Sequence, residues 1–218
     1  MWNSLALPCR YVYRAPLVAA ACLTSISCAS RTTEMETGAV VTTQPVPAMR
    51  SAQSITASWP MKPREAASIL IGKYGQPDVV GDRVLIWHER GPFKKIALMR
   101  DEQPHNFPMQ HTDFLTQTVM YRAPSDKLDE ITAYDGSVWF HRTRGELSAQ
   151  CDVEEMNYLA LNLAHDVATG ARTVEDARAF YAKTAMEFKQ GNRSSPYVTG
   201  LRFQPDRGAP DPDRAHQM

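Results

Sequence analysis

The chain has 218 residues, 43% of them hydrophobic and 22% charged, a composition that is typical of a globular protein and leaves no room for a second full domain. Its 24 basic and 24 acidic side chains balance. Because residues 1–28 hold Arg10 and Arg14 but no acid, the rest of the chain carries 22 basic against 24 acidic groups, a net charge of −2. This charge argues against nucleic acid as a partner.

An export signal is predicted at the N-terminus, over residues 1–28. Two arginines precede a short apolar run that ends in small residues. The run is shorter than the roughly 20 residues of a membrane-spanning helix, so we expect cleavage rather than anchoring by this segment. The Ser-Ile-Ser-Cys sequence that ends at Cys28 is similar to a lipobox, the motif at which bacterial lipoproteins are cut and lipidated. Two alternatives stay open: lipidation of Cys28, which would attach the protein to a membrane, or simple cleavage near the same site.

Polar segments flank the predicted domain. Residues 29–58 are rich in Thr, Ser, Ala and Pro and lack an apolar period, which predicts a flexible tether. Residues 192–218 combine prolines with Arg and Asp, which predicts a mostly disordered tail. A single domain is therefore expected over residues 59–191.

The first half of this domain has the pattern of a helix followed by strands. A helix is predicted from Pro63 to Tyr74, with Ala66, Ile69 and Leu70 on its buried stripe, and Gly75 ends it. Residues 84–87, 93–99 and 115–121 have the composition of strands, and the first two are antiparallel neighbours around Gly91-Pro92.

The second half adds a hairpin and more helices. A short helix after Pro124 precedes two strands, 137–143 and 146–151, which turn at Arg144-Gly145. Capping patterns at Asp152 and Thr173 then predict two consecutive helices, which should form an antiparallel hairpin against the sheet. The expected fold class is α+β, with an antiparallel sheet of about five strands packed against three or four helices.

Two resemblances bear on location. The segment 63–99, with its Lys-Tyr-Gly-Gln-Pro-Asp run at 73–78, is similar to the opening of small outer-membrane-assembly lipoproteins. The core over residues 59–190, with its runs at 107–109 and 142–146, resembles exported, lipoprotein-like proteins of Gram-negative bacteria. The resemblances imply a place in the periplasm or at the outer membrane, and they imply no activity.

The densest polar cluster falls in a predicted loop, residues 101–113, which contains His105, His111 and Asp113. Imidazole and carboxylate groups suit a divalent metal ion. His165 and Asp166 lie on the polar edge of a predicted helix and would complete such a site if that edge faces the loop. The alternatives are a structured loop whose histidines bond the backbone, and a helix edge that is simply solvated.

The predicted hairpin carries Trp139, His141, Arg142 and Arg144, which suit the recognition of anions or partner peptides. Pairing of its arginines with Glu146 explains them equally well. Cys151 is the only cysteine of the predicted domain, and no signature of a thiol nucleophile surrounds it, so we expect a small buried hydrophobe.

Two functional hypotheses follow. The first is a noncatalytic envelope protein that binds another envelope component through the hairpin around Trp139 to Arg144. The alternative is a metal-binding protein or metal-dependent envelope hydrolase that uses His105, His111 and Asp113, with His165 and Asp166 as further candidates. Convergence of at least three of these five side chains would favour the second hypothesis.

Overall fold

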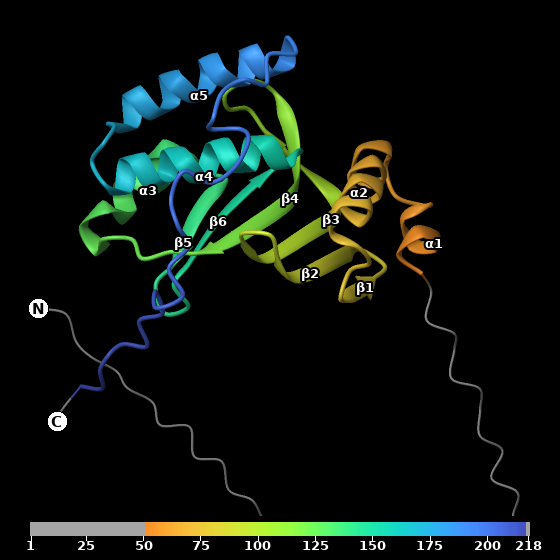
Figure 1. Ribbon diagram of the computed structural model, residues 1–218, viewed down its shortest axis with the longest axis horizontal. Coiled ribbons are helices and arrows are strands. Elements are labelled where there is room, and N and C mark those ends of the chain that lie inside the picture. The colour runs from red at the N-terminus through yellow and green to blue at the C-terminus, as the bar shows by residue number, and fades with distance from the viewer. Residues whose placement is uncertain (1–50, 217–218) are drawn as a thin grey trace, which may run out of the picture. The chain divides into compact units, whose positions relative to one another are not determined.

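The computed structural model describes residues 51–216, so the predicted signal, Cys28 and most of the predicted tether lie outside the described residues (Figure 1). The described part confirms the α+β class. A six-stranded antiparallel sheet, one strand more than the expected five, has the order β1-β2-β3-β4-β6-β5. Five helices pack with it.

The sheet is a series of antiparallel neighbours. Its strands are β1 Val79–Gly81, β2 Val84–Arg90, β3 Phe93–His105, β4 His111–Met120, β5 Val138–His141 and β6 Glu146–Cys151. Strands β5 and β6 turn at Gly145, whose φ of 58° favours glycine. The inner face of the sheet buries large apolar side chains, among them Leu85, Trp87, Leu98, Leu115 and Leu147.

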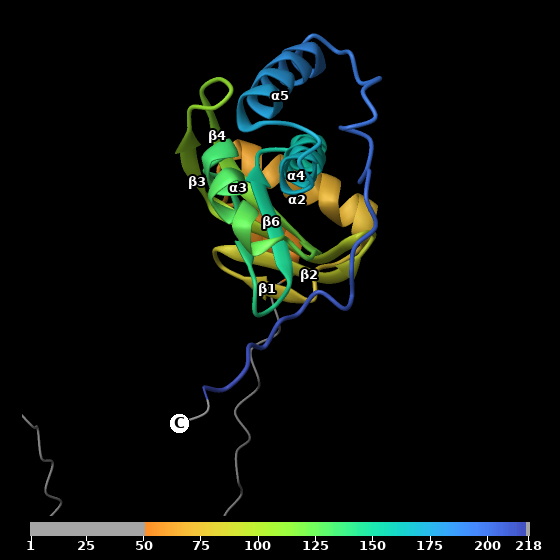
Figure 2. The same cartoon turned by 90° about the vertical axis from the view of Figure 1, so that its left-hand side faces the viewer.

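The predicted polar loop at 101–113 is largely a strand pair, which corrects the prediction. The pairing of β3 with β4 is interrupted by an irregularity between Leu98 and Gln103 and then resumes with Gln103 opposite Asp113 and His105 opposite His111. The pattern of apolar residues does not reveal this extension of the strands, because its side chains are mostly polar. The strands are joined there by backbone hydrogen bonds, which almost any residue type can make. In both ribbon views the far end of this hairpin rises toward the last helix (Figures 1 and 2).

The helices are α1 Ala52–Thr56, α2 Met61–Tyr74, α3 Leu128–Tyr134, α4 Glu154–Ala168 and α5 Val174–Lys189, with a short 3-10 turn at Ser125–Lys127 before α3. Helix α1 falls inside the range 29–58 that was predicted to be a tether, and its Ala52 and Ile55 are buried in the core. In α2 the buried residues are Pro63, Ala67 and Leu70, whereas Ile69 is 67% exposed. The prediction of Ile69 as buried was wrong, because the helix presents a neighbouring stripe to the sheet.

The helices form two layers on one side of the sheet. Helix α4 packs on β4 and β6, and α2 packs on β3 and β2. Helix α5 packs mainly on α3 and α4, so it lies farther from the sheet than α4 does (Figure 1). The predicted helical hairpin is therefore present. No helix among the described residues has the length and apolar character needed to cross a membrane.

Residues 192–216 form neither helix nor strand, yet they pack against the domain. The buried Asn162 on α4 donates to the carbonyl oxygens of Tyr197 and Gly200 and accepts from the backbone amide of Arg202. Farther on, Ala209 is buried against the turn at Gly145, where an added Cβ would lie 2.4 Å from the Ala209 carbonyl carbon. The segment that was predicted to be mostly disordered therefore makes specific contacts along α4 and the β5–β6 hairpin.

Candidate metal centre

The end of the β3–β4 hairpin brings together the three polar residues that the sequence singled out there. His105 and His111 are cross-strand partners, and Asp113 follows His111 by two residues, so its side chain points to the same face of the strand. One nitrogen of each imidazole and one carboxylate oxygen of Asp113 all lie within 4.8 Å of one another. The three predicted residues therefore do converge, and they lie on paired strands rather than in a loop.

Asp113 is the centre of this cluster. Its Oδ1 lies 3.0 Å from His111 Nε2, and its Oδ2 lies 3.2 Å from His105 Nδ1. The carboxylate is 2% exposed, while the two imidazoles keep partial contact with solvent. Asp113 Oδ1 has no hydrogen-bond partner among the described residues, although it lies within ion-pair distance of His111 Nε2.

Each candidate ligand is held in place by a partner outside the cluster. His111 Nδ1 lies 2.8 Å from the carbonyl oxygen of Met109, which accepts its proton and leaves Nε2 facing Asp113. The hydroxyl of Ser137 donates to Asp113 Oδ2. His105 Nε2 lies 3.6 Å from Asp135 Oδ1. Such outer partners fix the ring orientation and tautomer of metal-binding histidines.

The electrostatics of the cluster favour a cation. Burial raises the pKa of Asp135, and the nearby Asp113 carboxylate raises it further. The Asp113 carboxylate in turn raises the pKa of His111, against the opposing effect of burial. Two buried carboxylates close together are costly unless positive charge balances them. Protonated imidazoles can supply that charge, and so can a metal ion that is bound between the same atoms.

A pocket of about 340 Å³ opens beside the cluster. His111 forms part of its wall, and other lining residues are Lys62, Met109, Cys151, Met156 and Lys189. The pocket lies at the N-terminal end of α4, between this helix, α5 and the β3–β4 hairpin. The pocket opens the cluster to solvent on the side of His111, whereas His105 and Asp113 do not line it.

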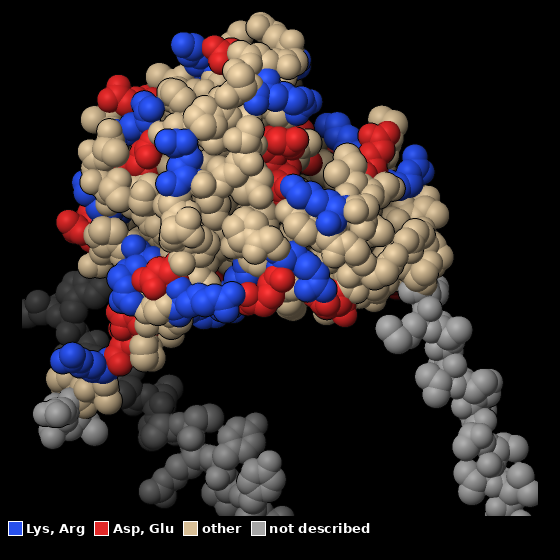
Figure 3. All heavy atoms as spheres, in the orientation of Figure 1, with Lys and Arg blue, Asp and Glu red and all other residues tan. Residues whose placement is uncertain are grey.

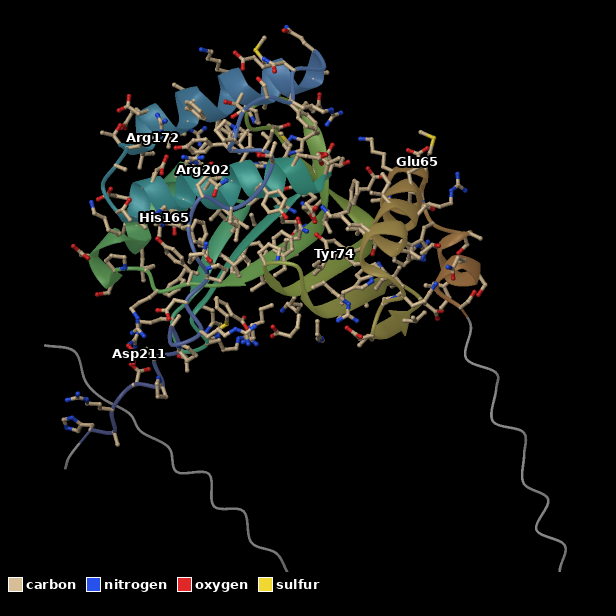
Figure 4. The ribbon with its side chains drawn as sticks, viewed as in Figure 1. Glu65, Tyr74, His165, Arg172, Arg202 and Asp211 are labelled. Carbon is tan, nitrogen blue, oxygen red and sulfur yellow. The ribbon has the colours of Figure 1, made fainter. Side chains whose placement is uncertain are left out.

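His165 and Asp166 do not join this cluster and have other partners. The Tyr121 hydroxyl and His165 Nδ1 share a hydrogen bond of 2.9 Å, and the ring of Phe203 stacks on the imidazole. Asp166 accepts from Arg172 and from the hydroxyl of Tyr197. Figure 4 shows His165 near the end of α4, beside the C-terminal segment, whereas the pocket lies at the start of that helix.

The predicted binding hairpin is partly occupied by the chain itself. Trp139 is 42% exposed, and His141 Nδ1 accepts from the backbone amide of Arg144. Arg144 pairs with Glu146, as the alternative interpretation expected. Arg142 pairs with Asp211 and Asp213 of the C-terminal segment, a contact that the sequence did not predict. Basic and acidic groups likewise lie beside one another over the face of the domain in Figure 3.

Three residues near the cluster were missed by the sequence reasoning. Asp135 and Ser137 precede β5, and Cys151 ends β6. Cys151 was predicted only as a small buried hydrophobe. It is buried, and the pairing of β6 with β4 sets it beside Leu115 and near His111. Burial raises the pKa of the Cys151 thiol, which disfavours a free thiolate nucleophile.

Comparisons of the chain with protein-family models, with curated proteins and with solved structures found no match.

Proposed function

We propose that this protein binds a divalent transition-metal ion, with zinc as the best-suited ion, through His105, His111 and Asp113. The observation that carries the proposal is the convergence of two imidazole nitrogens on a buried carboxylate oxygen, Asp113 Oδ1, that lacks a hydrogen-bond donor. Buried polar atoms almost always have a partner, so an unpaired one calls for an explanation. A bound cation supplies the missing partner and balances the neighbouring carboxylates.

The ligand types favour zinc over hard cations. Zinc binds imidazole nitrogen and carboxylate oxygen at about 2.0–2.2 Å, usually with four ligands in a tetrahedron. Magnesium and calcium prefer sites made of oxygen atoms alone. The outer contacts of His111 with Met109 and of Asp113 with Ser137 support the proposal because they hold the ligands before an ion arrives.

The hypothesis of a noncatalytic module that binds an envelope component through the hairpin has less support. Arg142 and Arg144 are engaged within the chain, so the recognition surface reduces to Trp139 and His141. Export stays a prediction. If the chain is exported, its metal site would lie in the periplasm or at the outer membrane.

Zinc binding to the full chain tests the proposal. We expect close to one zinc per chain by elemental analysis and one binding event by calorimetry. His111→Ala should abolish that event, whereas His165→Ala, which removes a half-buried histidine outside the cluster, should retain it. Circular dichroism checks that both variants fold. Absence of zinc binding by the folded wild-type chain, or equal binding by both variants, would refute the proposal.

A further inference from the structure

We propose that Cys151 is the fourth ligand of this metal site, so that the ion is enclosed by two imidazoles, one carboxylate and one thiolate. This inference rests on the proposed metal-binding function. Cys151 is the last residue of β6, and its backbone pairs with Leu115 of β4. Its Sγ lies 3.6 Å from His111 Nε2, the same nitrogen that lies 3.0 Å from the unpaired Asp113 Oδ1.

These spacings match the edges of a metal coordination tetrahedron. With zinc–nitrogen bonds of about 2.0–2.1 Å and zinc–sulfur bonds of about 2.3 Å, a tetrahedral nitrogen–sulfur edge is about 3.6 Å long, and a nitrogen–oxygen edge is about 3.3 Å long. His111 Nε2 therefore has a sulfur and a carboxylate oxygen at separations close to those of ligands that share one ion. Cys151 is not among the donors that all lie within 4.8 Å of one another. A four-ligand site thus requires an inward movement of its side chain or of His105.

The chemistry of binding is a proton exchange without any redox change. The sulfur–hydrogen bond of Cys151 breaks as the sulfur–zinc bond forms, because a thiol that coordinates zinc is deprotonated. Asp152 Oδ1 accepts from the Cys151 thiol at 3.5 Å, and both residues line the pocket. The released proton can therefore pass to the Asp152 carboxylate and from there to solvent.

A thiolate ligand determines what kind of metal site this is. Three protein ligands and a water molecule are typical of catalytic zinc, whereas four protein ligands are typical of zinc that is held without catalysis. Thiolate also favours soft ions such as zinc and copper(I) over magnesium and calcium. Cys151 as the fourth ligand points to a protein that holds or senses a thiophilic metal rather than a hydrolase.

Cobalt(II), a coloured substitute for zinc, tests the inference. The full chain carries Cys9, Cys22 and Cys28 as well, so the parent protein is the full chain with these three changed to serine, which leaves Cys151 as its only thiol. Cobalt should give visible ligand-field bands together with a near-ultraviolet thiolate-to-cobalt charge-transfer band in this parent. Cys151→Ser in the same background should lose the charge-transfer band. It should also weaken zinc binding by at least about tenfold, because even the loss of an outer partner of a ligand costs that much.

The outcomes separate this inference from the function on which it rests. Ligand-field bands without a charge-transfer band in the parent would mean that His105, His111 and Asp113 bind the ion without sulfur, which overturns the inference and leaves the metal site standing. No bands of either kind would overturn both. The spectrum of the parent decides the matter even if the Cys151→Ser chain fails to fold, and Cys151→Ala provides a second variant.

Discussion

His111 and His165 are both half-buried histidines beside an aspartate, yet their environments shift the pKa in opposite directions. The Asp113 carboxylate raises the pKa of His111, whereas burial lowers the pKa of His165 despite the opposing charge of Asp166. The difference lies in what else the aspartate contacts. Asp166 is already paired with Arg172 and bonded to Tyr197, whereas Asp113 Oδ1 lies 3.0 Å from His111 Nε2, and this contact is the largest cause of the raised pKa of His111.

The comparison teaches that a histidine beside a carboxylate indicates a binding site only when a ring nitrogen or a carboxylate oxygen lacks a hydrogen-bond partner within the protein. Around His165, the hydroxyl of Tyr121 bonds the imidazole, and the ring of Phe203 stacks on it and so packs the C-terminal segment against α4. Around His111, the Met109 carbonyl orients the ring through Nδ1. The other nitrogen, Nε2, faces Asp113 Oδ1, and we propose that these two atoms bind a ligand. The first arrangement is structural, and the second is suited to binding.

The largest expected effect separates the two aspartates. At a free zinc concentration about 1,000 times Kd, an ion that binds only the folded state should raise the free energy of unfolding by about 4 kcal/mol. Asp113→Asn should remove most of this increase, because the amide cannot replace the charged ligand. Asp166→Asn should keep it. Urea unfolding with and without zinc measures the increase in each variant.

The matched pair also guards against a nonspecific result. Asp166→Asn should lower the stability of the metal-free protein, since it weakens the contacts with Arg172 and Tyr197. An equal loss of the zinc-dependent increase in both variants would place the ion elsewhere, and the contrast between the two clusters would fail.

A smaller effect is expected at Asn162, which belongs to the structural side of the comparison. Asn162 is fully buried and bonds three backbone groups of the C-terminal segment at 2.7–3.0 Å. Asn162→Ala should lower the free energy of unfolding by about 2–3 kcal/mol, because it leaves buried backbone groups without partners. Asn192→Ala is the control, since Asn192 is exposed and its side-chain oxygen accepts from the nearby Ser194 alone among the described residues. Urea unfolding should show a change within about 0.5 kcal/mol for the control. A similarly small change at Asn162 would mean that the segment is not fastened there.

Most of the fold could be predicted from local patterns in the sequence. Gly75 ends α2 as expected, and the side chain of Thr173 accepts from the backbone amide of Asp176 at the start of α5, as the capping pattern indicated. These features depend on residues close together in the chain. The predicted cap at Asp152 was wrong because Val153 is the N-cap of α4, while Asp152 contacts Cys151.

The site could be predicted only where its residues share one hairpin. His105, His111 and Asp113 were found as a polar cluster within nine residues, and their convergence follows from the cross-strand pair that the hairpin creates. Cys151 and Ser137 belong to the predicted β5–β6 hairpin, but they reach the cluster only through the pairing of β4 with β6, whose register no local pattern specifies. The contacts of Arg142 with Asp211 and Asp213 were missed for the same reason, because they span about 70 residues.

The smallest effect is a pH dependence that arises from His165. Burial lowers the pKa of His165 below its usual 6.5, so the unfolded chain binds this proton more readily than the folded chain. Stability then rises with pH in this window, and the contribution of His165 is lost as the pH falls below about 6.5 toward the folded pKa. His165→Gln should therefore reduce the loss of unfolding free energy between neutral and mildly acidic pH, measured in metal-free buffer.

His141→Gln is the matched control, because His141 is exposed, and it should keep the wild-type dependence of the unfolding free energy on pH. If the slope is unchanged in His165→Gln, the imidazole is not held neutral by its surroundings, and the contrast with His111 disappears.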